Sequence, residues 1–167
     1  MTATNKTAQD KYQALTKLTT GDFKAFLYDC DGTLADTMPG HKKSYVRVAA
    51  EDGVLIGTIQ CWPVAHHSTD GTAIPLVMVG PVAVRPDIQR GGHGRALMVH
   101  MLEAAETEAD GALMMIGDPE YYGRFFGFDA DATGEWDLPG PYEKRRLLAR
   151  AVNGHPLPTG TGMIGPR

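Results

Sequence analysis

Apolar residues gather in short runs along the chain, and these runs predict most of its strands. Two of them flank Glu51-Asp52-Gly53, a turn sequence typical of a two-strand hairpin. Pro81 lies inside another run and removes a backbone donor there, so an edge or a bulge is expected at this point. The runs that predict strands are 23–28, 45–50, 54–62, 74–84 and 112–116.

Apolar residues at helical spacing predict helices in other segments. The most regular pattern lies in 94–109, and the segment 119–126 carries proline in its first turn, a favoured position for it. Shorter helices are predicted at 8–18 and 35–45, the second interrupted by Pro39-Gly40. The polar stretch 66–72 predicts an exposed turn, and the Pro- and Gly-rich stretch 153–167 predicts a tail with little regular structure.

Bulk properties favour one soluble, cytoplasmic domain. The chain has 167 residues, 43% of them hydrophobic, which suffices for a core. A net charge of −4 gives no electrostatic reason to expect a nucleic-acid partner. The N-terminus lacks an apolar signal region, and no stretch is long enough for a membrane span. Cys30 and Cys61 are expected as thiols, in neither a disulfide nor a metal site.

The glycine-rich stretch after the strand 74–84 carries the strongest chemical signal. The residues Gln89-Arg90-Gly91-Gly92-His93-Gly94-Arg95 open the helix 94–109. The first N–H groups of a helix lack internal partners and carry partial positive charge, so they can bind phosphate. Because glycines leave these groups accessible, we expect a pyrophosphate site here, with Arg90 and Arg95 adding full charges.

Two common phosphate-binding motifs do not fit this stretch. A Walker loop needs Lys-Ser/Thr after its last glycine, whereas Gly94 is followed by Arg95-Ala96. The dinucleotide fingerprint needs Gly-x-Gly-x-x-Gly, whereas Gly92-His93-Gly94 continues with Arg95, Ala96 and Leu97. The residues spell Gln-x-x-Gly-x-Gly instead.

With this motif, the chain resembles the GNAT superfamily of acetyl-CoA-dependent N-acetyltransferases over about residues 48–150. The segment from Ala112 to Asp118 resembles that family's next strand, and the segment from Pro119 to Phe128 resembles its Tyr-x-x-x-Gly-Phe helix. The resemblance implies an α/β fold of the acyl-CoA N-acyltransferase type. This fold is a mixed, mostly antiparallel sheet flanked by helices on both faces.

The resemblance also implies a site and a reaction. Acetyl-CoA would donate its acetyl group to a primary amine, a small molecule or a peptide. Strand 74–84 would splay from strand 112–116, and the pantetheine arm would occupy the gap. Tyr122 would protonate the departing thiolate, with Tyr121 as the alternative because the motif is one residue longer than usual. The cofactor-binding residues implied are Val82, Ala83, Val84, Gln89, Arg90, Gly91, Gly92, His93, Gly94 and Arg95.

A base or a chain of waters must neutralise the acceptor amine before it attacks. Four residues are candidates, and the sequence does not choose between them. They are Asp118, Glu120, His66 and His67.

The first third of the chain carries a different motif. The strand 23–28 ends in Asp29-Cys30-Asp31-Gly32-Thr33, which resembles motif I of haloacid dehalogenase-like (HAD) phosphatases over about residues 20–48. In that family the first aspartate attacks phosphorus and the second is an acid/base, with Mg²⁺ between them. The later motifs of that family are missing, since no lysine lies between Lys43 and Lys144.

The sequence therefore predicts a single domain of composite appearance. Residues 1–47 resemble the phosphatase motif, 48–152 an acetyltransferase body, and 153–167 form the tail. Acetyl transfer is the first hypothesis. A Mg²⁺-dependent phosphohydrolase using Asp29 and Asp31, or an inactive CoA-binding module, are the alternatives.

Overall fold

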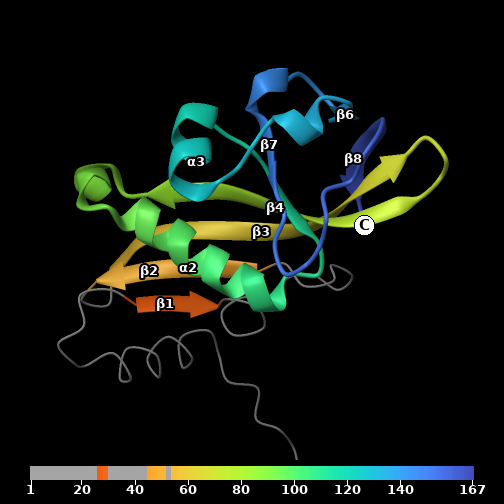
Figure 1. Cartoon of the computed structure of the whole chain (residues 1–167). Helices are drawn as coiled ribbons and strands as arrows, with labels where there is room; N and C mark the ends of the chain where they lie inside the picture. The colour runs from red at the N-terminus through yellow and green to blue at the C-terminus, as the bar shows by residue number, and fades with distance from the viewer. Residues whose placement is uncertain (1–25, 30–44, 52–53) are drawn as a thin grey trace, which may run out of the picture.

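One mixed, mostly antiparallel sheet organises the chain. The computed structural model describes residues 26–29, 45–51 and 54–167 (Figure 1). The main path of the sheet runs β1-β2-β3-β4-β5-β7, while β8 pairs with β3 and β6. Only the pairs β4–β5 and β6–β8 are parallel within the described residues. The strands are β1 (Phe26–Asp29), β2 (Tyr45–Glu51), β3 (Val54–Ser68), β4 (Ala73–Val84), β5 (Ala112–Ile116), β6 (Trp136–Asp137), β7 (Leu147–Arg150) and β8 (Gly162–Pro166).

Two α-helices and three short 3₁₀ turns connect the described strands. Helix α2 (His93–Glu108) and helix α3 (Pro119–Phe126) lie close to the predicted ranges 94–109 and 119–126. The 3₁₀ turns are η1 (Pro86–Gly91), η2 (Asp131–Thr133) and η3 (Lys144–Arg146). The helices predicted at 8–18 and 35–45 lie outside the described residues, except that Tyr45 begins β2. The predicted fold class is confirmed.

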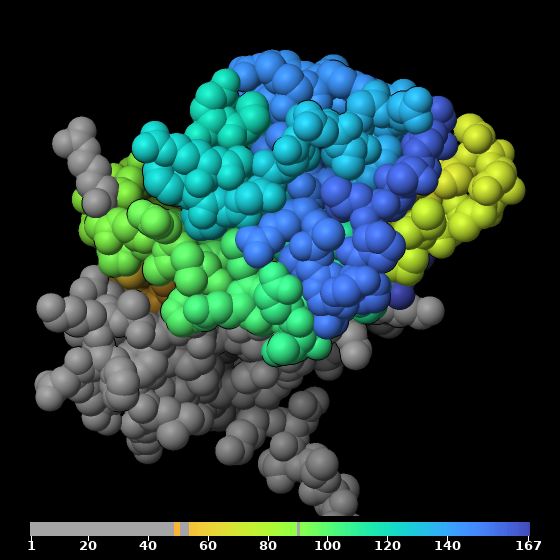
Figure 2. Space-filling model, in the orientation of Figure 1, coloured from red at the N-terminus to blue at the C-terminus, as the bar shows by residue number. Residues whose placement is uncertain are grey.

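Both described helices pack against the same face of the sheet. The core on this face joins α2 and Phe126 of α3 to apolar side chains of β3, β4 and β5. Figure 2 shows the surfaces of α2, in green, and α3, in teal, meeting on this side. A second core around Trp136 and Leu76 fills the opposite face, where β6, β8 and their loops supply the cover. No described helix lies on this second face, and the segments 8–18 and 35–44, where further helices are predicted, are outside the described residues.

The pairing of β2 with β3 confirms the predicted hairpin, and a bulge interrupts the next hairpin. Ile59 pairs with Val82 and Cys61 with Val79, so Gly80 and Pro81 face one residue of β3. This is the irregularity that Pro81 predicts, since it cannot donate to the ladder. The Trp62 indole N–H donates to the Gly80 carbonyl at 3.0 Å and holds the bulge in place.

Strands β4 and β5 part after three residue pairs. They are paired from Leu76 with Ala112 to Met78 with Met114. Beyond that point β5 continues beside β7 and β4 continues beside β3. Residues 79–84 of β4 therefore have no described strand on their second side, which confirms the expected splay.

The C-terminal stretch contains regular structure, so the prediction of an irregular tail is wrong. Strand β8 pairs antiparallel with β3 from Val64–Pro166 to Ser68–Gly162. It also pairs with β6. The long β3 extends past the end of β2, and β8 pairs with the edge that β2 leaves open there.

The prediction of an exposed turn at 66–72 is wrong for the first residues of that range. Strand β3 runs to Ser68, so His66 and His67 belong to the strand. The side chain of His66 is fully buried, with its ring centroid 5.3 Å from that of Trp136. A single sequence does not reveal that β6 and β8 return from far along the chain to cover it.

Candidate functional site

A cleft opens where β4 and β5 part. Its volume is about 240 Å³, and it lies between the end of β4, the start of α2 and the first turn of α3. Of the ten cofactor-binding residues that the sequence implies, six line it. Met98, Tyr121 and Tyr122 complete its wall. The six are Val82, Val84, Gln89, Gly92, Gly94 and Arg95.

The N-terminus of α2 is uncapped by side chains. Its N-cap, Gly92, has φ +79°, a left-handed conformation that glycine adopts without steric strain. No acidic residue lies in the first turn, and Gly94 leaves room beside the Val84 side chain. The positive end of the helix dipole therefore faces the cleft without a negative side chain of the first turn to neutralise it.

The connection before α2 is held to the end of β4. The Gln89 side-chain amide donates to the Val84 carbonyl at 3.4 Å, and the Arg85 N–H donates to the Ile56 carbonyl at 2.8 Å. Arg85 also forms an ion pair with Asp87 at 2.6 Å. These contacts fix the turn η1 from which Gly92 begins the helix.

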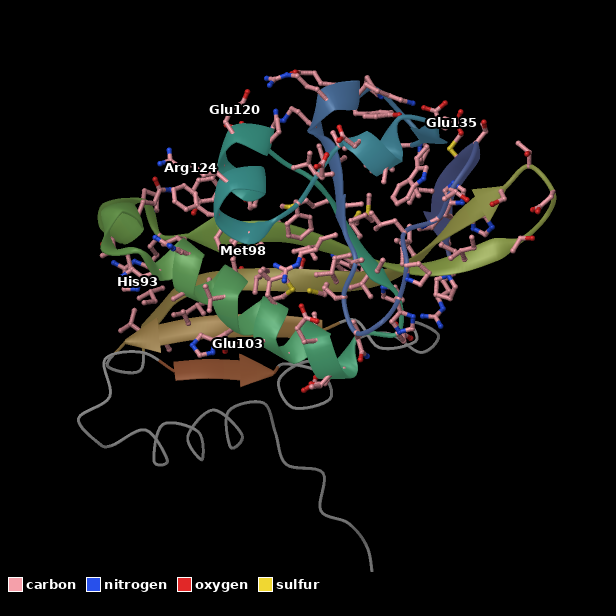
Figure 3. The ribbon with its side chains drawn as sticks, viewed as in Figure 1. His93, Met98, Glu103, Glu120, Arg124 and Glu135 are labelled. Atoms are coloured by element: carbon pink, nitrogen blue, oxygen red, sulfur yellow. The ribbon has the colours of Figure 1, made fainter. Side chains whose placement is uncertain are left out.

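Four implied residues do not line this cleft. Gly91 and His93 line a separate hollow with Pro86, Asp87 and Ile88. In Figure 3, His93 lies at the start of α2, away from Met98. Ala83 is exposed between two cleft residues, because successive strand residues point to opposite faces. The side chain of Arg90 is outside what the structure describes.

Met98 joins the cleft although the sequence suggests only a core role for it. It is 1% exposed and packs in the core shared by α2 and α3. Its position four residues after Gly94 puts it on the same side of the helix. This spacing is the sequence signal that identifies it.

Tyr122 is half-buried at the base of the cleft. Its ring lies against Gly117, where a Cβ atom would come within 2.5 Å of Tyr122 Cδ2. Burial raises the pKa of Tyr122, and Tyr121 raises it further while the charge of Arg146 opposes the shift. The phenol is thus protonated at neutral pH, as a proton donor must be.

Tyr121 lies on the exposed side of Tyr122. The two rings meet edge to face with centroids 5.0 Å apart, and Tyr121 is 39% exposed. Tyr121 also packs on Phe125, over which the guanidinium carbon of Arg95 lies at 5.1 Å. Both tyrosines reach the cleft, and the deeper one is Tyr122.

None of the four base candidates lines the cleft. Asp118 caps α3 by accepting from the Glu120 N–H at 3.2 Å, and Glu120 pairs with Arg145. Hydrogen bonding to Glu120, together with the charges of Arg145 and Arg146, lowers the pKa of Asp118. His66 and His67 lie at the far end of β3, beside β8. Glu120 and Asp118 are the candidates nearest Tyr122 in the chain, but Glu120 is paired with Arg145, and a lowered pKa makes Asp118 a weak base.

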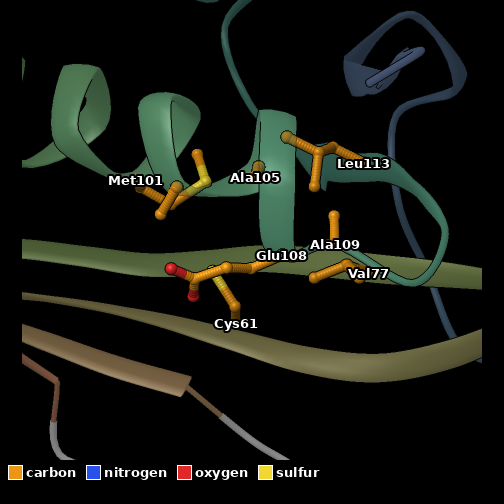
Figure 4. Close-up of a pocket in the computed structure, with 8 residues that line it drawn as sticks. Cys61, Val77, Met101, Ala105, Glu108, Ala109 and Leu113 are labelled. Carbon is orange, nitrogen blue, oxygen red and sulfur yellow. The ribbon is translucent and has the colours of Figure 1, made fainter. Parts of the chain in front are cut away.

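A third and smaller cavity lies between α2 and the sheet (Figure 4). Its volume is about 40 Å³ and most of its lining is apolar, apart from Glu108 and Cys61. This space suits a few waters at most. No group of three or more potential metal ligands occurs among the described residues, and none of their helices is long and apolar enough to cross a membrane.

Comparison with solved structures identifies the same architecture elsewhere. A GNAT family N-acetyltransferase, YhbS from Escherichia coli, solved with CoA, shares 21% identity at a TM-score of 0.61. The alignment covers 87% of this chain and 92% of that one. A GNAT family acetyltransferase from Brucella melitensis, solved with acetyl-CoA, shares 27% identity at a TM-score of 0.52. That alignment covers 71% of this chain and 64% of the other.

Sequence comparison gives a consistent answer. No curated protein sequence matches the chain. The sequence profile of the Acetyltransferase (GNAT) family matches residues 12–128, which is well over half of the chain. This range includes residues 20–48, so the comparisons give no support to a separate, phosphatase-derived segment. The chain belongs to the GNAT family of acetyltransferases.

Proposed function

We propose that this protein transfers an acetyl group from acetyl-CoA to a primary amine, at the cleft between β4 and β5. One observation carries the proposal: three features meet at one cleft. They are the uncapped N-terminus of α2, an edge of β4 that no described strand pairs with, and the half-buried Tyr122. The complexes of the two solved relatives with CoA and acetyl-CoA support the choice of cofactor.

In this proposal the pyrophosphate of the cofactor binds at the start of α2. Backbone N–H groups around Gly92 and Gly94 donate to its oxygens, with the helix dipole adding favourable charge. Arg95 lies at the cleft wall and supplies a full positive charge. Gly91 and His93 belong to the same proposed loop but line the separate hollow. Arg90 also belongs to it, although its side chain is outside what the structure describes.

The pantetheine arm then lies along the open edge of β4. Residues 82–84 have no strand partner on that side among the residues that the structure describes, so their backbone groups can pair with the arm's amides. A backbone N–H from Val82, Ala83 or Val84 polarises the thioester carbonyl and stabilises the oxyanion that forms during attack.

Tyr122 completes the transfer as a general acid. The neutral amine attacks the thioester carbon, the C–S bond breaks, and the phenol gives its proton to the leaving thiolate. The phenol is then restored by the proton that the amine nitrogen loses, carried through water. No base candidate lines the cleft, so we propose that water also deprotonates the incoming ammonium.

Thermal shift and thiol release test the proposal. Acetyl-CoA at 100 times its Kd should stabilise the fold by about 2.7 kcal/mol. Replacing Gly92 and Gly94 together with valine should abolish this shift, because the side chains would block the helix N–H groups. Gly134→Val, a substitution at an exposed glycine outside the cleft, is the control and should keep the shift. A normal shift in the double variant would refute the pyrophosphate site.

Phosphate-ester hydrolysis has no specific observation in its favour. Asp29 ends β1, which pairs antiparallel with β2, while Asp31 lies outside the described residues. Stabilisation by Mg²⁺ with a phosphate analogue, and not by acetyl-CoA, would favour it. Stabilisation by acetyl-CoA without thiol release on any amine would favour an inactive CoA-binding module. A cytoplasmic location remains part of our proposal.

A further inference from the structure

A cation lies beside Gly117, the residue that follows β5 and against which the Tyr122 ring packs. The Gly117 N–H donates to the Arg146 carbonyl at 2.9 Å, and Arg146 Nε donates back to the Gly117 carbonyl at 3.2 Å. Two hydrogen bonds therefore hold the half-buried Arg146 next to Gly117, the residue on which the Tyr122 ring packs.

The guanidinium of Arg146 influences both neighbouring groups. Its charge opposes the rise in the pKa of Tyr122 and contributes to the lowered pKa of Asp118. These shifts agree with the hydrogen bonds in putting Arg146, Asp118 and the phenol in one neighbourhood. Arg146 does not line the cleft itself, but it lies beside Gly117, against which the Tyr122 ring packs.

Arg146 differs from its neighbour in how its charge is balanced. Arg145 pairs with Glu120 at 3.2 Å and with Glu143 at 3.3 Å. Across the described part of the chain, Arg146 has no carboxylate within ion-pair distance. The charge of Arg146 acts on Asp118 from beyond ion-pair distance. The Asp118 carboxylate accepts a hydrogen bond from the Glu120 N–H at the start of α3. A half-buried guanidinium with N–H groups to spare is suited to an anion from outside the protein.

We propose that Arg146 binds a carboxylate of the acceptor, so that the acceptor class is an amino acid or another primary amine with a carboxylate near its nitrogen. This inference rests on the proposed acetyl transfer. A planar guanidinium matches the two oxygens of a carboxylate. Asp118 disfavours a dianion such as a phosphate monoester, because like charges repel, while a single negative charge remains acceptable.

The wild-type protein tests the inference first. Initial rates of thiol release from acetyl-CoA are compared for phenylalanine, phenethylamine and phenylalaninamide, with O-phosphoethanolamine and ethanolamine as a second set. Phenethylamine lacks the carboxylate and has a more basic nitrogen, whereas the amide has a less basic one, so the two bracket the effect of amine pKa. We expect kcat/KM for phenylalanine to exceed both by tenfold or more.

Two variants then locate the preference. Arg146→Gln should reduce the ratio of kcat/KM for phenylalanine over phenethylamine by about tenfold or more, mainly through KM, since a charge-assisted hydrogen bond contributes that much to affinity. Arg145→Gln, with the same loss of charge one residue away, should leave the ratio unchanged. Arg146→Lys keeps the charge and should retain part of the preference.

The outcomes separate this inference from the function beneath it. No thiol release with any amine would overturn the proposed acetyl transfer itself. Release without a preference for phenylalanine, or a preference for O-phosphoethanolamine, would overturn the carboxylate assignment alone. A ratio unchanged in Arg146→Gln would do the same. If that variant does not fold, the wild-type comparison and Arg146→Lys still decide.

Discussion

The phenol of Tyr122 is kept protonated by its surroundings. Burial raises its pKa above the ordinary 10.0, and the neighbouring Tyr121 adds to the shift. The leaving group is the thiolate of CoA. A free cysteine thiol, which serves as its reference, has a pKa of about 8.5. A group with a higher pKa is still able to donate within the transition state, because the charge on sulfur forms as the proton moves.

Tyr122→Phe should lower kcat by about 10²- to 10⁴-fold, the usual contribution of general acid–base catalysis. The KM for acetyl-CoA should change little, because the ring and its packing remain. Steady-state thiol release measures both. In the wild type, activity should not fall on the alkaline side until the pH passes 10, since the folded pKa lies above that value. If Tyr121→Phe lost kcat to this extent while Tyr122→Phe stayed active, Tyr121 would be the general acid instead of Tyr122.

His66 is buried as a neutral group. Its ring packs on Trp136, Ser68 Oγ lies 3.2 Å from Nδ1, and Nε2 has no hydrogen-bond partner in the described chain. Burial lowers its pKa from 6.5, and the Gly160 backbone opposes the shift by less. Protonation therefore favours the unfolded chain.

The free energy of unfolding should consequently fall as the pH drops below 6.5, the value expected for His66 in the unfolded chain. Above that pH the contribution is complete, and it is lost as the pH falls toward the lower pKa of the folded state. Urea unfolding between pH 7.5 and 5.0 measures this change. His66→Gln removes the titrating group and should give a flatter profile; equally steep profiles would exclude His66 as the cause.

At the scale of elements, the junction of β5 and α3 positions Tyr122, the proposed general acid. Strand β5 is an apolar run covered on both faces, and α3 begins three residues later with Asp118 as its cap and Pro119 in its first turn. Gly117 connects the two and has no side chain where the Tyr122 ring lies. The direction of α3 and the absence of one Cβ atom together put Tyr122 in the cleft.

Gly117→Ala should therefore displace Tyr122. The new methyl group would come within 2.5 Å of the ring, and overpacking of this kind costs about 1–3 kcal/mol. Displacement of the phenol should also reduce kcat by tenfold or more, given the sensitivity of catalysis to placement. Thermal unfolding and thiol release measure the two effects. Gly134→Ala is the matched control, because its nearest atom is 3.9 Å away and its φ is −55°.

At the scale of the whole molecule, α2 links the site to the core. Its first turn forms the proposed pyrophosphate site, and its remaining turns bury Leu97, Met98, Met101 and Leu102 against the sheet. The small cavity of Figure 4 lies under the last of these turns. The position of the helix N-terminus thus depends on packing far from the cleft.

Met101→Ala should destabilise the protein by about 2–5 kcal/mol, because it enlarges this cavity at a side chain that is only 3% exposed. Val99→Ala on the same helix should change stability by about 0.5 kcal/mol or less, since Val99 is 40% exposed. Chemical denaturation measures both. Equal effects would mean that α2 is not anchored through its buried face.

Local patterns were sufficient where a residue's neighbours in sequence are also its neighbours in space. The predicted ranges 94–109, 112–116 and 119–126 lie close to α2, β5 and α3, because helical periodicity, an apolar run and a cap are local signals. The bulge at Pro81 follows from one missing N–H. The prediction failed for His66 and for β8, whose partners lie far along the chain.

The sequence by itself determined the family, the order of the main described elements and the glycine-rich start of α2, since these depend on contiguous residues. Only the tertiary structure decided which of the implied residues share one cleft. It separated Gly92 and Gly94 from Gly91 and His93, and it brought Arg146 to Gly117, against which the Tyr122 ring packs. The physical reason is that the directions of side chains, and the pairing of distant strands, follow from packing across the sheet.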